Sequence, residues 1–222
     1  MATYTKTFHQ SEGAANFGYG KYNTSDWHTN SSFPAYQGDY DSTSAGSRVG
    51  FCFLDNVGST LTGKSISNIA LSITYTNAGK SDDAVLTICK SLVTAAPKTG
   101  DGIKGSNVVG DTLGTLTAPY NTTSSYTLNS SSNTALFNAM AAYLAAGNNM
   151  LVFYNGETKS GTYTSNYRGI SDLTITVTYT DPGIVYYKNN GTWVKCKVYY
   201  KNNGTWVQVK PYYKNNGTWT LV

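Results

Sequence analysis

The side chains best suited to chemistry near the C-terminus are aromatic rings and lysines that recur at a fixed spacing. The segment Tyr-Tyr-Lys-Asn-Asn-Gly-Thr-Trp occurs three times with a period of 13 residues. Tryptophan rings stack on sugar faces, and lysine pairs with phosphate or carboxylate groups. The ligand-binding candidates in this region are Trp193, Trp206, Trp219, Lys195, Lys197 and Lys210. The alternative is that the lysine stems merely cover the tryptophan rings on a solvated surface.

A second aromatic-rich segment runs from Phe17 to Tyr40, among Asn, Ser, Thr and Gly residues. Rings and amide side chains in such a loop could hold a sugar, and the candidates here are Trp27, Tyr36 and Tyr40. The alternative is that these rings pin a long N-terminal loop onto the rest of the fold, since a loop of this length needs packing of its own.

Residues that could carry out catalysis are scarce. The chain has two histidines, His9 and His28, and two glutamates, Glu12 and Glu157. Neither histidine lies in a metal-binding motif, and neither a nucleophile elbow nor a phosphate-binding loop occurs. We therefore expect that the protein is not an enzyme, that it has no catalytic residues, and that it binds no metal and no cofactor.

Paired carboxylates leave two weaker alternatives. Calcium could be held by oxygen ligands at Asp39 and Asp41 or at Asp82 and Asp83. A hydrolase of cell-wall or capsule polysaccharide needs two carboxylates that converge on one bond. Glu157 and Asp39 are the residues on which such a hydrolase would have to depend.

Composition favours an all-β protein. Charged residues make up 13% of the 222 residues, against about 25% in an average globular protein. Ser, Thr, Gly and 19 tyrosines supply the polarity instead, which is typical of strands and unlike the surface of a helical bundle. No apolar run is long enough to cross a membrane, and the first six residues lack the apolar region of a signal peptide. We expect no membrane insertion and no secretory signal.

Charge divides the chain into two predicted domains. Residues 1–181 carry 10 Lys and Arg against 12 Asp and Glu, a net charge of −2. Residues 182–222 carry six Lys and no acidic residue, a net charge of +6. We call residues 1–181 the body and residues 182–222 the tail. Six dispersed lysines without arginine or a recognition motif do not favour a nucleic-acid partner.

Strand-like alternation of apolar and polar residues covers most of the body. The expected strands are 48–54, 66–76, 84–90, 111–116, 125–128, 150–154 and 173–179. Residues 134–146 have the pattern of one helix, with Asn133 as its N-cap and Gly147 ending it. Two packed antiparallel sheets with Greek-key or jelly-roll wiring are expected, that is, an all-β sandwich with one short helix at its end. Cys52, Cys89 and Cys196 are expected as buried free thiols.

Each Asn-Asn-Gly of the tail predicts a tight turn, because Asn and Gly adopt positive φ at low cost. The alternation between the turns predicts a small antiparallel meander with strands 184–188, 192–201, 205–214 and 218–222. A sheet of this size is too small to be stable alone. Its apolar face is therefore expected to pack on the body, on a sister chain or on another protein.

The order of these segments resembles a known family, the jelly-roll modules of tail and fibre proteins from phages of Gram-positive bacteria. The matching segments are Ala35-Tyr-Gln-Gly-Asp-Tyr40, Gly50-Phe-Cys-Phe, Leu61-Thr-Gly-Lys-Ser-Ile66, the strand ending at Tyr75, the helix ending at Gly147, Met150-Leu-Val-Phe-Tyr154 and the closing Leu-Thr-Ile-Thr-Val-Thr-Tyr179. Those modules are similar to carbohydrate-binding modules. The tail resembles the short Gly-x-Trp repeats that end many such virion proteins.

The resemblance implies a virion structural protein without enzymatic activity, a component of a tail, baseplate or fibre that takes part in attachment to the host surface. With this role we expect other virion proteins and, in a homo-oligomer, further copies of this chain as partners. The Lys, Trp and Tyr face of the tail could meet a cell-wall glycan or an anionic wall polymer such as teichoic acid. Such a protein assembles in the host cytoplasm and leaves by lysis as part of the virion. The alternatives are a carbohydrate-binding, lectin-like module without a virion role, and a capsid decoration protein.

Overall fold

The structure is a computed structural model that describes residues 3–9, 17–29, 34–40, 45–76, 82–158, 163–181, 185–209, 212–215 and 218–221. In the tail, the side chains of 185–187, 193–195 and 207–221 lie outside this description. The strands of the body are β1 Thr3–His9, β2 Phe17–Lys21, β3 Trp27–His28, β4 Ala35–Gln37, β5 Arg48–Phe53, β6 Ser65–Thr76, β7 Ala84–Ser91, β8 Val109–Ala118, β9 Thr123–Asn129, β10 Met150–Phe153 and β11 Arg168–Thr180. The helices are α1 Val57–Leu61, the 3-10 turn η1 Gly105–Asn107 and α2 Thr134–Ala145.

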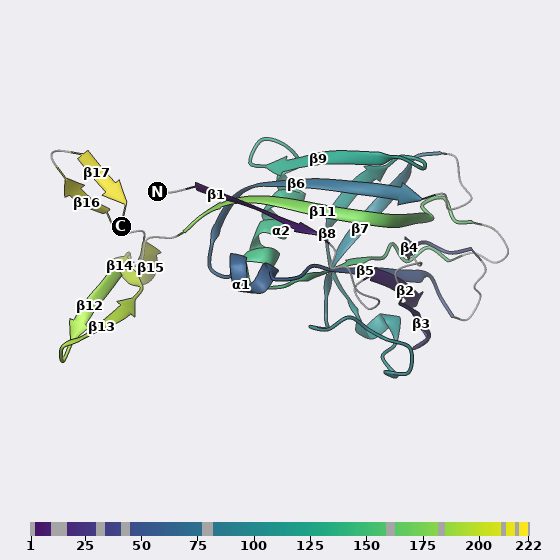
Figure 1. The fold of residues 1–222 in the computed structure, drawn as a ribbon, viewed down its shortest axis with the longest axis horizontal. Coiled ribbons are helices and arrows are strands. Elements are labelled where there is room, and N and C mark those ends of the chain that lie inside the picture. The colour runs from purple at the N-terminus through teal and green to yellow at the C-terminus, as the bar shows by residue number, and fades with distance from the viewer. Residues whose placement is uncertain are drawn as a thin grey trace.

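The body is an all-β antiparallel sandwich, as its composition and alternation predict. One sheet has the order β1-β11-β6-β9, and β4 also pairs with β11. Figure 1 shows these long strands side by side in one layer. The other sheet has the order β3-β2-β5-β10-β7-β8. Every pair within both sheets is antiparallel.

The order of the strands is that of a jelly roll. When β1 and β5 to β11 are numbered one to eight along the chain, the first sheet reads 1-8-3-6 and the second reads 2-7-4-5. This interleaved order is the double Greek key of a jelly roll. The short strands β2 and β3 extend the second sheet beyond β5.

The main core lies between the two sheets and is built from the inward-facing residues of the alternating strands. On β6 the buried residues are Ile69, Leu71, Ile73 and Tyr75, as the period of two predicts. On β11, Leu173, Ile175 and Val177 are buried while Tyr179 is partly buried. The opposite side of this sheet carries rows of hydroxyl side chains. There, Thr7 Oγ1 and Thr176 Oγ1 are hydrogen-bonded at 3.0 Å.

A second, smaller core covers the outer side of the six-stranded sheet. It consists of Trp27, Val49, Phe51, Cys89, Val108, Met150 and Val152, with Val93, Ala96 and Ile103 of the β7–β8 connection packed against it. Because both of its faces are covered, β10 is buried at all four residues. This explains why the sequence of β10 is a continuous apolar run rather than an alternating one.

Helix α2 packs against β6, β8 and β9 and buries Leu136, Phe137, Met140, Tyr143 and Leu144. Figure 1 shows α1 and α2 at the same end of the sandwich. Gly147 ends α2 as predicted, with a φ of 91° and its N–H bonded to Leu144 O at 2.9 Å. Asn133 occupies the predicted N-cap position, but its side chain makes no capping bond. Asn133 adopts a left-handed conformation and its Nδ2 donates to Thr127 O at 3.1 Å, so the side chain does not cap the helix.

The tail consists of β hairpins rather than the predicted continuous meander. Its strands are β12 Val185–Asn189, β13 Thr192–Cys196, β14 Val198–Asn202, β15 Thr205–Val209, β16 Tyr212–Asn215 and β17 Thr218–Leu221. Among the described residues, β12 pairs with β13, β14 with β15, and β16 with β17, each as a separate two-stranded sheet. The expected strand 192–201 is divided at Lys197, because each strand pairs within its own repeat.

The predicted turns are confirmed in the first two repeats. Asn190 and Gly191 have φ values of 46° and 86°, and Asn203 and Gly204 have values of 45° and 87°. Two successive residues with positive φ define the turn type that best suits the twist of a two-residue hairpin. In the third repeat the corresponding residues, 216 and 217, lie outside the described residues.

Candidate functional site

Trp27, a predicted sugar-stacking residue, lies in the second core instead of on a surface. Its side chain is 1% exposed, its ring packs edge-on against Phe51, and its Nε1 donates to Ile103 O at 2.7 Å. The alternative given for the aromatic segment, that the rings pin the N-terminal region onto the sandwich, therefore describes Trp27. A ring buried in this way offers no face to a ligand, so the assignment of Trp27 as ligand-binding was wrong.

Tyr36 and Tyr40, the other two candidates of this region, belong to a group of rings around one arginine. We call this group the aromatic–arginine cluster, and its members are Tyr19, His28, Tyr36, Tyr40, Arg48, Tyr163 and Tyr167. The residues come from β2, β3, β4, the turn after β4, β5 and the segment that precedes β11. Antiparallel pairing of β2 with β5, and of β4 with β11, brings these distant segments together.

The rings of the cluster stack in pairs. Tyr36 stacks on Tyr167 with centroids 5.5 Å apart, and Tyr40 stacks on Tyr163 at 4.5 Å. Tyr163 also contacts Tyr167 at 4.9 Å, which joins the two pairs into one row. Within the row, Tyr167 is 5% exposed and Tyr36 is partly buried, while Tyr40 at the end is 41% exposed. Such a row presents ring edges, one open face and phenol hydroxyls to a ligand.

Arg48 contacts two rings of the row, Tyr36 and Tyr167, and also the ring of Tyr19. Its guanidinium carbon is 4.6 Å from the centroid of Tyr19, 5.3 Å from that of Tyr36 and 5.7 Å from that of Tyr167. These distances are in the range of cation–π attraction. The backbone N–H of Arg48 donates to Gly38 O at 2.8 Å, which fixes the turn between Tyr36 and Tyr40.

Two glycines make room for Tyr36. A Cβ on Gly50 would lie 2.8 Å from both the backbone N and O of Tyr36, and a Cβ on Gly169 would lie 2.7 Å from the ring atom Cε1. Backbone and ring can therefore approach β5 and β11 only because both positions lack a side chain. The glycine positions thus set the location of Tyr36 in the cluster.

The phenols of Tyr36 and Tyr167 stay protonated at neutral pH. Burial raises the pKa of Tyr36, and the nearby Arg48 charge opposes this rise. Burial also raises the pKa of Tyr167, again opposed by Arg48. Neutral phenols donate and accept hydrogen bonds but do not serve as bases. The cluster is therefore suited to stacking and hydrogen bonding.

Asp39 and Glu157, the carboxylates that a hydrolase would need, take part in the framework around the cluster. Asp39 is fully buried, and its Oδ1 accepts from Tyr40 N at 2.8 Å. Glu157 Oε1 accepts from Asn166 Nδ2 at 2.7 Å, and its Oε2 accepts from Asn166 N at 3.0 Å. These bonds hold the strand ends on which the cluster stands. Glu157 and Asp39 therefore have positioning roles in this structure.

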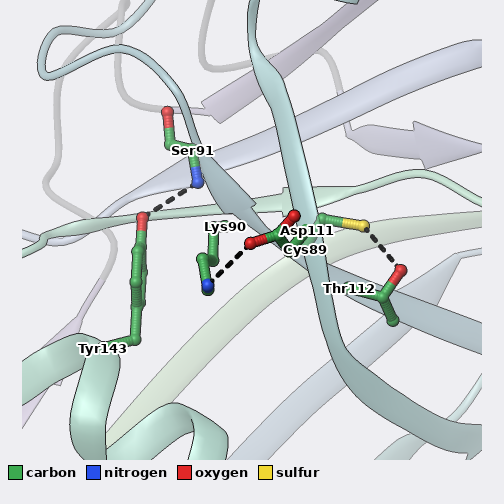
Figure 2. A network of polar contacts seen from close by, with 6 residues as sticks. All are labelled: Cys89, Lys90, Ser91, Asp111, Thr112 and Tyr143. Carbon is green, nitrogen blue, oxygen red and sulfur yellow. Dashed lines mark hydrogen bonds and ion pairs between the residues drawn. The ribbon is translucent and has the colours of Figure 1, made fainter.

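A surface cavity of about 370 Å³ lies at the start of β8. It is lined by Thr87, Cys89, Val109, Gly110, Asp111, Thr112, Tyr154, Asn155 and Gly156. The polar contacts at its wall are drawn in Figure 2, where Lys90 Nζ donates to Asp111 Oδ2 at 2.8 Å and Cys89 Sγ lies 3.8 Å from Thr112 Oγ1. Ser91 N donates to Tyr143 OH at 3.0 Å beside them.

Cys89, at this cavity wall, is not set up as a nucleophile. Burial raises the pKa of its thiol, which keeps the unreactive thiol form at neutral pH. The exposed carboxyl of Asp111 has its pKa lowered by the hydrogen bond from Lys90. Among the described residues, no three His, Cys, Asp or Glu side chains are grouped so that they could hold a metal ion. Asp41, of the suggested calcium pairs, lies outside those residues.

The tail candidates are placed unequally. Trp206 is 65% exposed and Lys197 is exposed at the junction of two hairpins. The backbones of Trp193, Lys195 and Trp219 lie in strands β13 and β17, but their side chains fall outside the description, and Lys210 lies outside the described residues entirely. The described tail side chains, 188–192 and 196–206, include no buried residue, so the expected packing of an apolar face is not seen in this part.

Sequence inspection missed most of the aromatic–arginine cluster. Arg48 was assigned only to a strand, and Tyr19, Tyr163 and Tyr167 were not proposed as binding residues. The available signal was the spacing Tyr163-Thr-Ser-Asn-Tyr167 before a long strand. That spacing alone does not reveal which distant residues it meets.

Within the portion of the chain that the structure describes, no helix has the length and apolar character needed to cross a membrane. A scan against protein-family models gave no match for this chain, and a comparison with curated proteins gave none either.

Proposed function

We propose that this protein is a non-enzymatic structural component of a bacteriophage virion, in the tail, baseplate or fibre, that helps the particle attach to the host cell surface. The observation that carries the proposal is the tail. It repeats one hairpin in which a lysine lies opposite a tryptophan. In the second repeat, where both side chains are described, Lys201 and Trp206 are exposed. An exposed aromatic ring beside a cation is available to stack on a sugar and to pair with an anionic group of a partner.

The jelly-roll body supports this proposal without fixing it. The same wiring serves viral structural proteins and lectin-like domains, so it fits a role in holding and binding. The framework roles of Asp39 and Glu157 also favour binding over hydrolysis. The partners proposed are other virion proteins, further copies of this chain, and a cell-wall glycan or teichoic acid.

Purified particles provide the test of the virion role. We expect the protein in particles purified by density gradient, and antibody-gold labelling of those particles should place it on the tail, baseplate or fibre. Labelling on the head instead would support the capsid-decoration alternative over attachment. Absence from purified particles would overturn the virion role altogether.

The second candidate function is a carbohydrate-binding module without a virion role, and the aromatic–arginine cluster favours it. Its outer residue, Tyr40, is exposed and stacked on Tyr163. A glycan array with the full chain and the Tyr40→Ala variant tests this function. Selective binding of one sugar that Tyr40→Ala abolishes, in a protein absent from particles, would establish the second candidate.

A further inference from the structure

The three tail hairpins are copies of one unit at the level of strand pairing. The register places Lys188 opposite Trp193, Lys201 opposite Trp206 and Lys214 opposite Trp219. Directly opposed residues of an antiparallel pair lie on the same face of the ribbon. The same lysine–tryptophan pairing therefore occurs once in each of the three hairpins.

The second hairpin shows what one such unit offers to a ligand. Lys201 Nζ lies 5.9 Å from the centre of the Trp206 ring, within the range of a cation–π contact. The ring remains 65% exposed, and Tyr199 and Tyr200 are 46% and 47% exposed. A positive charge and an open aromatic face are thus held side by side by the two-residue turn at Asn203 and Gly204.

The charge of the tail selects the sign of its ligand. Residues 182–222 contain six lysines and no acidic residue. A charged group next to an aromatic face suits a ligand that alternates a negative group with a sugar or polyol, since the ring packs on the C–H groups while lysine pairs with the anion. Without arginine, the tail lacks the planar, bidentate cation that favours nucleic acid.

We propose that each hairpin is a separate weak site, and that the three sites bind successive units of one linear polymer of sugar or polyol phosphate. This inference rests on the proposed attachment function and specifies its ligand. One residue separates β13 from β14 and two separate β15 from β16, so the sites are closely tethered. Tethered sites bind a polymer about 10²- to 10⁴-fold more tightly than one site binds a single unit.

The test uses the full chain with a soluble poly(glycerol phosphate) and with glycerol 3-phosphate as its single unit, compared by titration calorimetry. The variants are Lys188→Gln, Lys201→Gln and Lys214→Gln, singly and combined, with Trp206→Ala as an aromatic variant. Each lost hairpin should weaken polymer binding by about 10- to 100-fold, by a similar factor whichever hairpin is altered. Binding of the single unit should be weak in every protein.

Substitutions of two other lysines are compared with the hairpin variants, because each removes one positive charge outside the three lysine–tryptophan pairs. Lys98 is exposed on the body and Lys197 is exposed between two hairpins. Lys98→Gln should leave polymer affinity unchanged, and Lys197→Gln should lower it less than any hairpin variant. If Lys98→Gln weakens binding as much as Lys201→Gln, the attraction follows net charge alone and the hairpins are not sites.

Other outcomes would also overturn the inference. Polymer affinity equal to that of the single unit would show that the hairpins do not act together. If single-stranded DNA of the same charge binds as tightly as the polyol phosphate, the class of polymer inferred here is wrong. If the graded loss is found but the protein is absent from purified particles, only the virion role fails. If the protein is present in particles but the graded loss is absent, only this inference fails.

Discussion

The side-chain amide of Gln37 donates to the main-chain oxygen of Asn166 at 2.8 Å and thereby ties the end of β4 to the segment before β11. Gln37 Nε2 also donates to Val85 O at 2.6 Å, and its Oε1 accepts from Thr87 N at 2.8 Å. The side chain is fully buried. One amide therefore joins β7 to β4 and to the segment before β11, both of which carry residues of the aromatic–arginine cluster.

Replacing Gln37 by Leu should destabilise the body strongly. The change leaves the Thr87 N–H and two carbonyl groups without this partner in a buried place, and a buried unsatisfied group costs about 1–3 kcal/mol. We expect urea unfolding to show a loss of about 3 kcal/mol. Thr176→Val, on the exposed hydroxyl face, should change stability by less than about 0.5 kcal/mol. Equal effects of the two variants would contradict the role assigned to Gln37.

Trp27 and Trp206 were both assigned to ligand binding from the sequence, but only the truncation of Trp27 should lower the stability of the body. Trp27→Ala removes a buried ring and the hydrogen bond to Ile103 O, and such truncations cost about 3–5 kcal/mol. Trp206→Ala removes a ring that is 65% exposed and should leave the stability of the body unchanged. Chemical denaturation followed by tyrosine-region circular dichroism measures both. A Trp27→Ala protein with native stability would show that this ring does not form part of a core.

Gly50→Ala should weaken the contact between β4 and β5. Its Cβ would lie 2.8 Å from the backbone N and O of Tyr36, and backbone atoms cannot move aside as a flexible side chain can. We expect a loss of about 1–3 kcal/mol, typical of overpacking. Gly100→Ala is the control, since its Cβ would meet nothing within 4 Å and only its φ of 92° adds strain. A smaller loss for Gly50→Ala than for Gly100→Ala would refute the close approach.

The three cysteines should differ in their reaction with an aromatic disulfide reagent. None is in a disulfide, and burial raises the pKa of both Cys52 and Cys89. Cys196 is partly exposed in the first tail hairpin. At pH about 8 the folded protein should therefore release one equivalent of the aromatic thiolate quickly, from the reaction of Cys196. Only in denaturant should all three cysteines react. Cys196→Ser should remove the fast equivalent, and a fast reaction that survives this change would contradict the prediction.

Stability should fall in alkaline solution because several tyrosines are buried. Burial raises the pKa of Tyr154 to about 12, and it also raises the pKa of Tyr75 and Tyr143. An unfolded tyrosine loses its proton near pH 10. Above that pH the unfolded state binds fewer protons than the folded state, so the free energy of unfolding decreases as pH rises.

Urea midpoints at pH values from about 8 to about 11 measure this effect. The midpoint should begin to fall above pH about 8, because burial also raises the pKa of the Cys52 and Cys89 thiols. It should fall more steeply above pH about 10, where unfolded tyrosines lose their protons, and this steeper part should be shallower in Tyr154→Phe. Tyr199→Phe changes an exposed tail residue and should leave the curve as it is. A midpoint that does not decline above pH about 10 would argue against the burial of these phenols.

Alternation was sufficient to predict the long strands β6 and β11, because each has one face buried in the core and one face toward solvent. The residues expected to face inward on β6 are those that the sandwich buries. On β11 the same holds for Leu173, Ile175 and Val177, whereas Tyr179 is only partly buried. The same reasoning missed β1 to β4 and α1. Strand β1 buries only Phe8, β2 contains two glycines, β3 has two residues and α1 has five, so none carries a pattern long enough to recognise.

Pairing partners could not be predicted in the same way. In the tail, alternation continues through Lys197 and is equally consistent with a meander or with separate hairpins. In the candidate site, Tyr36 and Tyr40 were identified by type alone. Their neighbour Tyr167 lies more than a hundred residues away and reaches them only because β4 pairs with β11.

The pairing of β1 with β11 places Thr3 opposite Thr180. The first strand of the sandwich therefore cannot pair in the sheet until the last strand is present. During synthesis on the ribosome, β1 leaves the exit tunnel long before its neighbour in the sheet has been translated. In a cell making many copies at once, the β11 of one nascent chain can meet the β1 of another before its own. Exchange of β1 between copies is therefore one way in which two chains of this topology can be linked.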